Sequence, residues 1–170
     1  NKKYFFIGIG GIGMSSIAQY LHEKENIILG YDASENKSIK ILLKKGIDVI
    51  NKLSLKSIPD YMKKDDVIVV YTPAIPDDNI FLKYFRKNGN NQIYKRSEML
   101  GEISRQSKCI AVAGTHGKTT TSAIISHLFH SSGIHFKAFI GGIMKCFDSN
   151  FINTGNDYII VEADEYDRSF

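Results

Sequence analysis

The sequence has few of the residues that build covalent or metal-held frameworks. Its 170 residues include two cysteines, three prolines and no tryptophan. Cys109 and Cys146 lie far apart in the chain, without the Cys-x-x-Cys spacing or the nearby histidines of a zinc site. We therefore expect no zinc site, and two reduced thiols in a cytosolic protein.

Long hydrophobic runs are also missing. No apolar stretch approaches the roughly 20 residues that span a bilayer. Tyr4–Ile7 follows two lysines and so imitates the start of a signal peptide, but four glycines interrupt the stretch after it and no cleavage site follows. The sequence therefore predicts a cytoplasmic protein without a membrane partner.

Arginine is scarce, and no segment concentrates charge of one sign. The net charge of +4 arises from 22 Lys and Arg residues, four of them arginine, against 18 Asp and Glu residues. The lysines are scattered through residues 37–45, 52–64 and 83–95. This scatter favours a solvated surface over nucleic-acid binding, although it would mildly attract anionic substrates. We expect no nucleic-acid partner.

Short apolar runs alternate with amphipathic stretches over the first hundred residues. We expect strands at residues 4–9, 27–31, 47–50, 67–71 and 92–94, and helices at residues 14–25, 36–45, 77–87 and 97–106. This alternation predicts an α/β fold with right-handed βαβ units, a Rossmann-like doubly wound parallel sheet. Residues 1–106 are its expected extent, with ligands bound beyond the carboxyl ends of the strands.

A second unit is expected from residue 107 onward, as the start of a P-loop-type α/β ATPase domain. A strand at residues 108–113 leads through a glycine turn to a helix at residues 118–132, and two more strands follow at 136–140 and 158–161. Three strands are fewer than a nucleotide-binding α/β domain normally has. We therefore expect residues 107–170 to be an incomplete domain in a fragment of a longer chain.

A glycine-rich turn follows the first expected strand. It reads Gly8-Ile9-Gly10-Gly11-Ile12-Gly13. Glycines between a strand and a helix let a pyrophosphate approach the helix start, and Asp32, 19 residues beyond Gly13, ends the next strand, where it could meet a ribose hydroxyl. The pattern predicts a pyrophosphate ligand, either a dinucleotide or a UDP-sugar. A turn that only packs helix on strand is the alternative.

A different glycine turn lies about a hundred residues further along. It reads Gly114-Thr115-His116-Gly117-Lys118-Thr119-Thr120. The spacing is a shortened phosphate loop, because Val112 stands where the first glycine usually lies. Lys118 would reach the transferred phosphate of ATP, while the Thr119 hydroxyl would ligate Mg²⁺. Glu162 ends an apolar strand, where an acidic Mg²⁺ ligand belongs.

Two further features of this region are less specific. His116 lies within the turn, so we expect it to face ligand or metal rather than the core. Asp164, Glu165 and Asp167 are read as a solvated acidic loop slightly in preference to further metal ligands.

Three motifs in this order resemble the Mur ligases of peptidoglycan synthesis. They are Gly8–Ser15, Gly114–Thr121 and Val161–Glu165. The histidine of the second motif points to the branch that adds alanine to a muramate nucleotide, or to the ligases that recycle murein peptides. The Gly-Gly-x-Gly-Met form of the first motif favours the former. Arg96–Glu102 also resembles the segment that leads such ligases into their central domain, so the resemblance spans nearly the whole chain but only the amino-terminal part of a three-domain enzyme.

The resemblance implies an ATP-dependent, Mg²⁺-assisted ligase. ATP would phosphorylate the lactyl carboxylate of UDP-N-acetylmuramate, and the amine of L-alanine would attack the acyl phosphate. The implied substrate-binding residues are Gly8, Gly10, Gly11, Gly13, Met14, Asp32, Thr72 and Pro73. The implied ATP-binding residues are Gly114, Thr115, His116, Gly117, Lys118, Thr119 and Thr120. Lys118 and His116 are the expected catalytic residues, and Thr119 and Glu162 the metal ligands.

Two other functions stay open at this point. An NAD(P)-dependent oxidoreductase would explain Gly8–Gly13 and Asp32 but would leave the Gly-Lys-Thr turn without a role. A non-catalytic UDP-sugar-binding module would account for a fragment. For the fragment alone we expect binding of UDP-N-acetylmuramate without amide-bond formation.

Overall fold

The computed structural model describes residues 1–63, 66–88 and 91–163. By its internal contacts the chain divides into two compact units, residues 1–96 and 97–170. The expected boundary fell after residue 106, so the structure counts most of helix α4 (Arg96–Ser104) with the second unit. No helix in the described ranges is long and apolar enough to cross a membrane.

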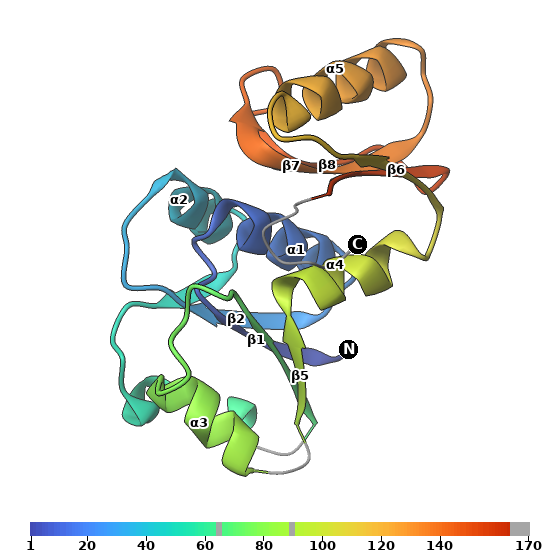
Figure 1. Ribbon diagram of the computed structural model, residues 1–170. Helices are drawn as coiled ribbons and strands as arrows, with labels where there is room; N and C mark the ends of the chain where they lie inside the picture. The colour runs from blue at the N-terminus through green and yellow to red at the C-terminus, as the bar shows by residue number, and fades with distance from the viewer. Residues whose placement is uncertain (64–65, 89–90, 164–170) are drawn as a thin grey trace. The chain divides into compact units, whose positions relative to one another are not determined.

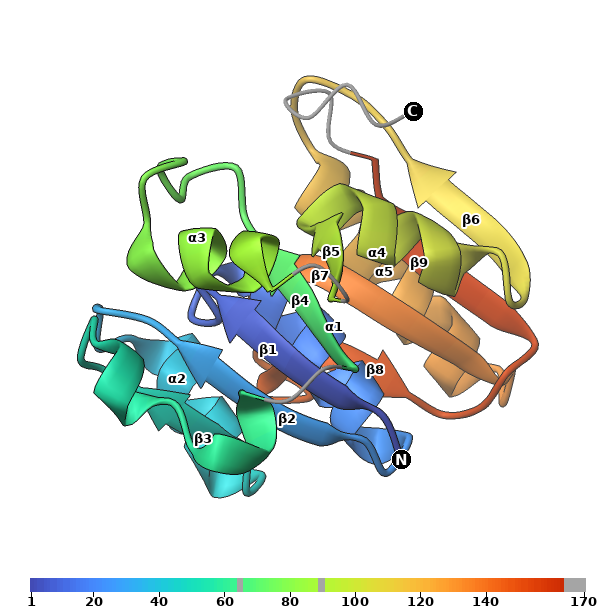
Figure 2. The ribbon, with the colours of Figure 1, turned by 90° about the horizontal axis from the view of Figure 1, so that it is seen from below.

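The first unit is built on a parallel sheet of five strands (Figure 1). The strands are β1 (Lys3–Ile7), β2 (Ile27–Tyr31), β3 (Asp48–Ile50), β4 (Val67–Tyr71) and β5 (Gln92–Lys95). They lie in the order β3-β2-β1-β4-β5, and Figure 2 shows them side by side. The order reverses between β1 and β4, so the carboxyl ends of these two strands form the switch point where ligands bind in such sheets. The predicted Rossmann-like fold is confirmed.

Helices cover both faces of this sheet. Helices α1 (Ile12–Glu23) and α2 (Lys37–Lys44) lie on one face, and α3 (Ile80–Lys87) lies on the other (Figure 1). The side chain of Asn36 caps α2 by accepting from the Ile39 N–H at 3.0 Å, and Asn79 caps α3 in the same way. Helix α1 has no side-chain cap, because it starts directly from the glycine turn at Gly11.

An aromatic cluster holds α3 against the sheet. Phe5 of β1 is fully buried, and its ring centroid lies 5.5 Å from that of Phe81 and 5.0 Å from that of Phe85. Each buried side chain of this size contributes about 1.5–3 kcal/mol by leaving water. Ile58 and Met62, from the connection between β3 and β4, extend the same core.

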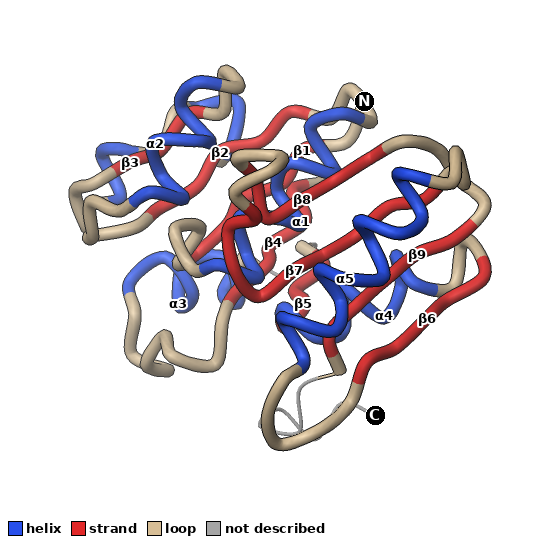
Figure 3. The backbone as a smooth tube through the Cα atoms, turned by 90° about the horizontal axis from the view of Figure 1, so that it is seen from above, coloured by secondary structure: helices blue, strands red, loops and turns tan. Residues whose placement is uncertain are grey.

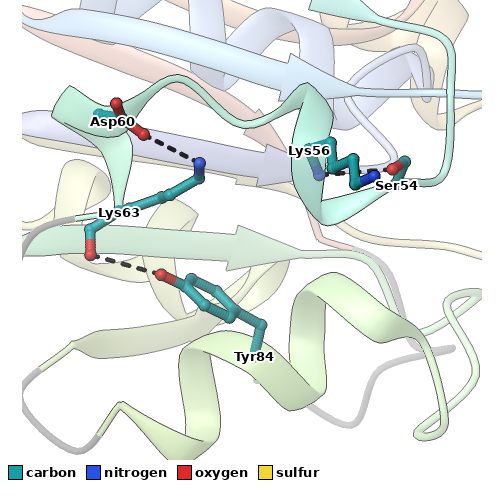
Figure 4. Close-up of polar contacts among 5 residues, drawn as sticks. All are labelled: Ser54, Lys56, Asp60, Lys63 and Tyr84. Carbon is teal, nitrogen blue, oxygen red and sulfur yellow. Dashed lines mark hydrogen bonds and ion pairs between the residues drawn. The ribbon is translucent and has the colours of Figure 1, made fainter.

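Two short 3-10 helices, η1 (Leu55–Ser57) and η2 (Asp60–Met62), order that connection. Ser54 caps η1 by accepting from the Lys56 N–H at 3.3 Å, as Figure 4 shows. The Lys63 ammonium lies 2.9 Å from Asp60, and this hydrogen bond lowers the pKa of the Asp60 carboxyl. The Tyr84 hydroxyl of α3 donates to the Lys63 carbonyl at 3.4 Å, which ties the connection to the helix.

The second unit has a sheet of four strands in the order β6-β9-β7-β8. The strands are β6 (Lys108–Val112), β7 (Phe136–Met144), β8 (Ser149–Asn153) and β9 (Tyr158–Glu162). β6, β9 and β7 are parallel, whereas β8 is antiparallel to β7. Helix α5 (Lys118–Ser131) lies along this sheet (Figure 3), and its Phe129 packs on the buried Phe136.

The expectation of three strands in this unit was wrong. β8 was missed because Ser149, Asn150 and Asn153 give it a polar composition, although its first four residues are buried. β7 also runs through a pair of glycines to Met144 instead of ending at Ile140. For β8, pairing with β7 therefore outweighs the low strand propensity of its serine and asparagine residues.

Candidate functional site

The turn that follows β1 is closely packed against the end of β4. Gly8 has a φ of +85°, a conformation that favours glycine, and its N–H donates to the Tyr31 carbonyl at 2.8 Å. A Cβ added at Gly8 would lie only 2.7 Å from Cγ2 of Thr72. The structure thus brings together the glycine turn and the segment after β4, as expected for residues at neighbouring carboxyl ends.

Asp32 holds this turn from the side of β2. One carboxylate oxygen, Oδ2, accepts the Gly10 N–H at 2.8 Å, and the other, Oδ1, accepts from the Ser34 N–H at 2.9 Å and hydroxyl at 2.6 Å. The Asn36 amide donates to the Gly10 carbonyl at 3.1 Å. Both backbone groups of Gly10 are therefore engaged by the connection between β2 and α2. The expected contact of Asp32 with a ligand stays a prediction.

Sequence reasoning missed Ser34 and Asn36. The available signal was the Asp-x-Ser-x-Asn spacing before a helical segment, because these residue types form side-chain turns and helix caps. Of the other predicted residues, Pro73 is exposed, whereas Met14 is 1% exposed and its side chain lies in the core.

Arg96 was also missed as a neighbour of the glycine turn. A Cβ added at Gly13 would lie 2.8 Å from Nη1 of Arg96, so the guanidinium rests against the first turn of α1. The start of a helix and a guanidinium both attract an anion. Arg96, the first residue of α4, therefore adds a positive charge to the region where a pyrophosphate is predicted.

The second turn, residues 114–117, is exposed and depends on backbone conformation. Gly114 has a φ of +145° and Gly117 a φ of +79°, and Gly117 caps α5 without any side-chain hydrogen bond. The first N–H groups of a helix lack partners within the helix. The Lys118 ammonium reaches back across the loop to the Gly114 carbonyl at 2.7 Å. His116 is exposed in the same turn.

Glu162 meets this turn at the carboxyl edge of the sheet. The register of β6 and β9 pairs Val112 with Glu162, so the turn after β6 and the Glu162 side chain emerge side by side. The Thr119 hydroxyl donates to Oε2 of Glu162 at 3.0 Å, and the Gly141 N–H of β7 donates to Oε1 at 2.7 Å. The predicted pair of metal ligands is therefore in contact.

Gly141 was not foreseen as a member of this group. Its signal in the sequence is the pair Gly141-Gly142 inside an apolar strand, because a glycine there often marks a close approach of other atoms.

The arrangement fits a magnesium ion bound through few protein ligands. Within the described residues, no three His, Cys, Asp or Glu side chains gather at one point. Mg²⁺ is commonly held by one or two protein groups together with phosphates and waters, and adjacent ligands of its octahedron lie about 2.9 Å apart for bonds of about 2.0–2.1 Å. The 3.0 Å between Thr119 and Glu162 agrees with this spacing. Asp164, Glu165 and Asp167 lie outside the described residues.

Comparison with known proteins identifies the family of this chain. The sequence profile described as Mur ligase family, catalytic domain, matches residues 3–108, more than half of the chain. The chain belongs to the Mur ligase family. The resemblance noted in the sequence is thereby confirmed.

Two relatives among the curated proteins share a name. A UDP-N-acetylmuramate–L-alanine ligase of Porphyromonas gingivalis is 46% identical over 171 residues, which cover 99% of this chain and 37% of the relative. The protein of the same name from Christiangramia forsetii is 42% identical, with 99% of this chain and 38% of the relative covered. This Mur ligase chain therefore spans about 37% of the length of such relatives.

Two solved structures of UDP-N-acetylmuramate ligases resemble the structure of this chain. The UDP-N-acetylmuramate-alanine ligase of Thermotoga maritima matches with a TM-score of 0.85 and 30% identity over 95% of this chain and 37% of that one. The UDP-N-acetylmuramate:L-alanyl-gamma-D-glutamyl-meso-diaminopimelate ligase of Neisseria meningitides also has a TM-score of 0.85, with 25% identity over 98% of this chain and 53% of that one.

Proposed function

We propose that this chain belongs to an ATP-dependent ligase that joins L-alanine to the lactyl carboxylate of UDP-N-acetylmuramate. In this proposal, residues 1–106 are the UDP-substrate-binding domain and residues 107–170 begin the central ATP-binding domain. This proposal rests on one observation. The Thr119 hydroxyl contacts the Glu162 carboxylate beside Lys118, where β6 leads through the glycine turn at residues 114–117 into α5. The shared name of the curated relatives supports the choice of substrate.

The protein would contribute to this reaction mainly by aligning the reactants and stabilising the charge of the phosphates. Lys118 would exchange its bond to the Gly114 carbonyl for the β- and γ-phosphates of ATP, a movement within one loop. Thr119 and Glu162 would hold Mg²⁺, which when bound neutralises charge on the phosphates. The γ-phosphoryl group would pass to the lactyl carboxylate, and the amine of alanine would then displace phosphate from the acyl carbon.

The UDP end of the substrate would bind at the first turn. Its pyrophosphate would lie at the start of α1, near Gly11, Gly13 and Arg96, with Thr72 and Pro73 lining the same edge. Both oxygens of the Asp32 carboxylate already accept hydrogen bonds from the protein, but a carboxylate has about four acceptor positions, so this engagement does not separate a dinucleotide ribose from a UDP-sugar. The shared name of the curated relatives favours the UDP-sugar over the oxidoreductase alternative.

Calorimetric titration of the chain with UDP-N-acetylmuramate and with NADH tests the substrate. We expect binding of the UDP-sugar, with at least tenfold weaker binding after Gly13→Ala, because the added methyl group would displace Arg96. Gly101→Ala is the matched control, since a Cβ there meets no atom within 4 Å. Tight NADH binding with no response to the UDP-sugar would contradict the proposal.

The same chain tests the domain assignment. We expect no alanine-dependent release of ADP from it, because the chain spans about 37% of the length of the ligases to which it is similar. Alanine-dependent ADP release from the 170-residue chain would contradict that assignment.

A further inference from the structure

Gly141 occupies a position in β7 where a side chain would strike Glu162. A Cβ added there would lie 2.6 Å from Oε2, and 3.2 Å from both Cδ and Oε1, of that carboxylate. Contacts below 3.0 Å are essentially never made by real Cβ atoms, so an alanine would force the carboxylate to move. The neighbouring Gly142 is less confined, because its Cβ would meet only the Thr119 methyl group at 3.1 Å.

The backbone at this position does not itself require glycine. The glycines with positive φ among the described residues are Gly8, Gly46, Gly114, Gly117, Gly133 and Gly155. Gly141 is outside this set, so an alanine could adopt its conformation without strain. The need for glycine therefore comes from the space occupied by the Glu162 carboxylate.

We propose that Gly141 is a positioning residue that fixes the direction of the Glu162 carboxylate. Its N–H donates to Oε1 at 2.7 Å, and its missing side chain leaves room for Oε2 to lie beside Thr119. A backbone N–H bonded to a carboxylate is a strong, charge-assisted contact. One oxygen is thereby anchored, and the other is directed to the position predicted for Mg²⁺. This inference rests on the proposed function, which makes Glu162 a metal ligand.

The principal test is Gly141→Ala, compared with Gly101→Ala as a control for glycine replacement. The Mn²⁺–ATP complex serves as the probe, because ATP itself binds Mn²⁺ in solution, and the change in its electron paramagnetic resonance spectrum on adding protein reports the protein-bound complex. Loss of a group that orients a metal ligand typically weakens affinity 10–100-fold. We expect a loss of this size for Gly141→Ala and less than a twofold change for Gly101→Ala. Equal affinities for the two variants would overturn the proposal.

A double-variant cycle with Glu162→Asp separates positioning from a general effect on folding. The shorter side chain withdraws the carboxylate from the added methyl group, so Gly141→Ala should weaken Mn²⁺ binding much less in the Glu162→Asp background than in the wild type. Fully multiplicative losses would show that Gly141 does not act through Glu162, and would overturn the proposal.

A crystal structure of Gly141→Ala provides a readout without metal. We expect the bond between Thr119 and Glu162 to be broken, and a carboxylate that keeps its place would overturn the proposal. If wild-type protein failed to bind Mn²⁺ with ATP, the proposed metal role of Glu162 would fall, whereas this structure would still decide whether Gly141 positions the carboxylate.

Discussion

The two glycine turns of this chain both join a parallel strand to a helix, yet they use glycine for different reasons. In the turn after β1, added Cβ atoms at Gly8, Gly10 and Gly13 would all lie within 2.8 Å of neighbouring side chains, and only Gly8 of these three also has a positive φ, of +85°. In the turn after β6, a Cβ at Gly117 would meet nothing within 4 Å, and its φ of +79° is what favours glycine. The first turn is fixed by packing against neighbouring side chains, whereas the second has open space at Gly117.

The difference in packing follows from the side chains around each turn. Asp32 and Asn36 bind the N–H and carbonyl of Gly10, so the first turn has its shape before any ligand arrives. In the second turn the Lys118 ammonium satisfies the Gly114 carbonyl, and an arriving phosphate could take its place. We infer that the first turn is preorganised and that the second changes its contacts on binding.

The largest expected effect comes from removing the cation of the open turn. In a full-length protein that carries this chain, Lys118→Ala should lower ATP-dependent turnover by at least about 100-fold, because a charge aimed at the transferred phosphate is lost. Binding of UDP-N-acetylmuramate should stay within about twofold of wild type, since the first turn is untouched. Steady-state ADP release and calorimetry measure the two quantities, and unchanged turnover would refute the assignment of this turn.

Alanine replacement within the two turns should separate packing from conformation. Gly10→Ala should lower the free energy of unfolding by about 1–3 kcal/mol, because its Cβ would overlap Asp32 and Ile39. Gly117→Ala has open space and should lose about 1–2 kcal/mol through its positive φ alone. Urea unfolding measures both. Only Gly10→Ala should also weaken UDP-sugar binding, and the reverse pattern would contradict the comparison.

A smaller effect is expected from replacing Asn36, whose side chain donates a hydrogen bond to the first turn. Asn36→Ala removes both the cap of α2 and the hydrogen bond to the Gly10 carbonyl, so it should lower the free energy of unfolding by about 1 kcal/mol. Ser54→Ala is a matched control, since it removes a cap in the same unit that has no link to the turn. If the two variants bound UDP-N-acetylmuramate equally, the hydrogen bond from Asn36 to the Gly10 carbonyl would have no part in substrate binding.

The smallest expected effect is on the stability of the first unit at alkaline pH. Burial raises the pKa values of Tyr4 and Tyr20 above the ordinary value of 10.0. Because the folded state retains these protons longer, stability is unaffected below pH 10 and falls as the pH rises through the folded pKa values. The combined variant Tyr4→Phe and Tyr20→Phe should unfold with a shallower dependence on pH above about 10, as measured by thermal melts. An unchanged dependence would contradict the burial argument.

Much of this molecule follows from local patterns in its sequence. Alternation of apolar strands with amphipathic helices was enough to predict β1 to β5 and the turn at Gly8. The contact between Thr119 and Glu162 was also predictable, because Thr119 follows β6 through the glycine turn, Glu162 ends β9, and the carboxyl ends of parallel strands meet at one edge. These predictions need only short segments and one general rule of topology.

What escaped prediction depends on pairings between distant segments. Gly141 reaches Glu162 only because β7 lies beside β9, and the sequence around Gly141 says nothing about that neighbour. β8 is too polar to be recognised without its partner. The position of Asp32 was predictable, but the direction of its carboxylate toward Gly10 depends on how the turn and the β2–α2 connection pack together.

The central claim is that the two turns serve two different phosphorylated ligands. Amide chemical shifts of the chain, recorded with UDP-N-acetylmuramate and separately with Mg²⁺ and ATP, test it most directly. We predict that the UDP-sugar shifts the amides of residues 8–13 and Thr72, and that Mg²⁺ with ATP shifts those of residues 114–119 and Glu162. Shifts of residues 8–13 by NADH but not by the UDP-sugar, or no shifts at 114–119 with Mg²⁺ and ATP, would contradict it.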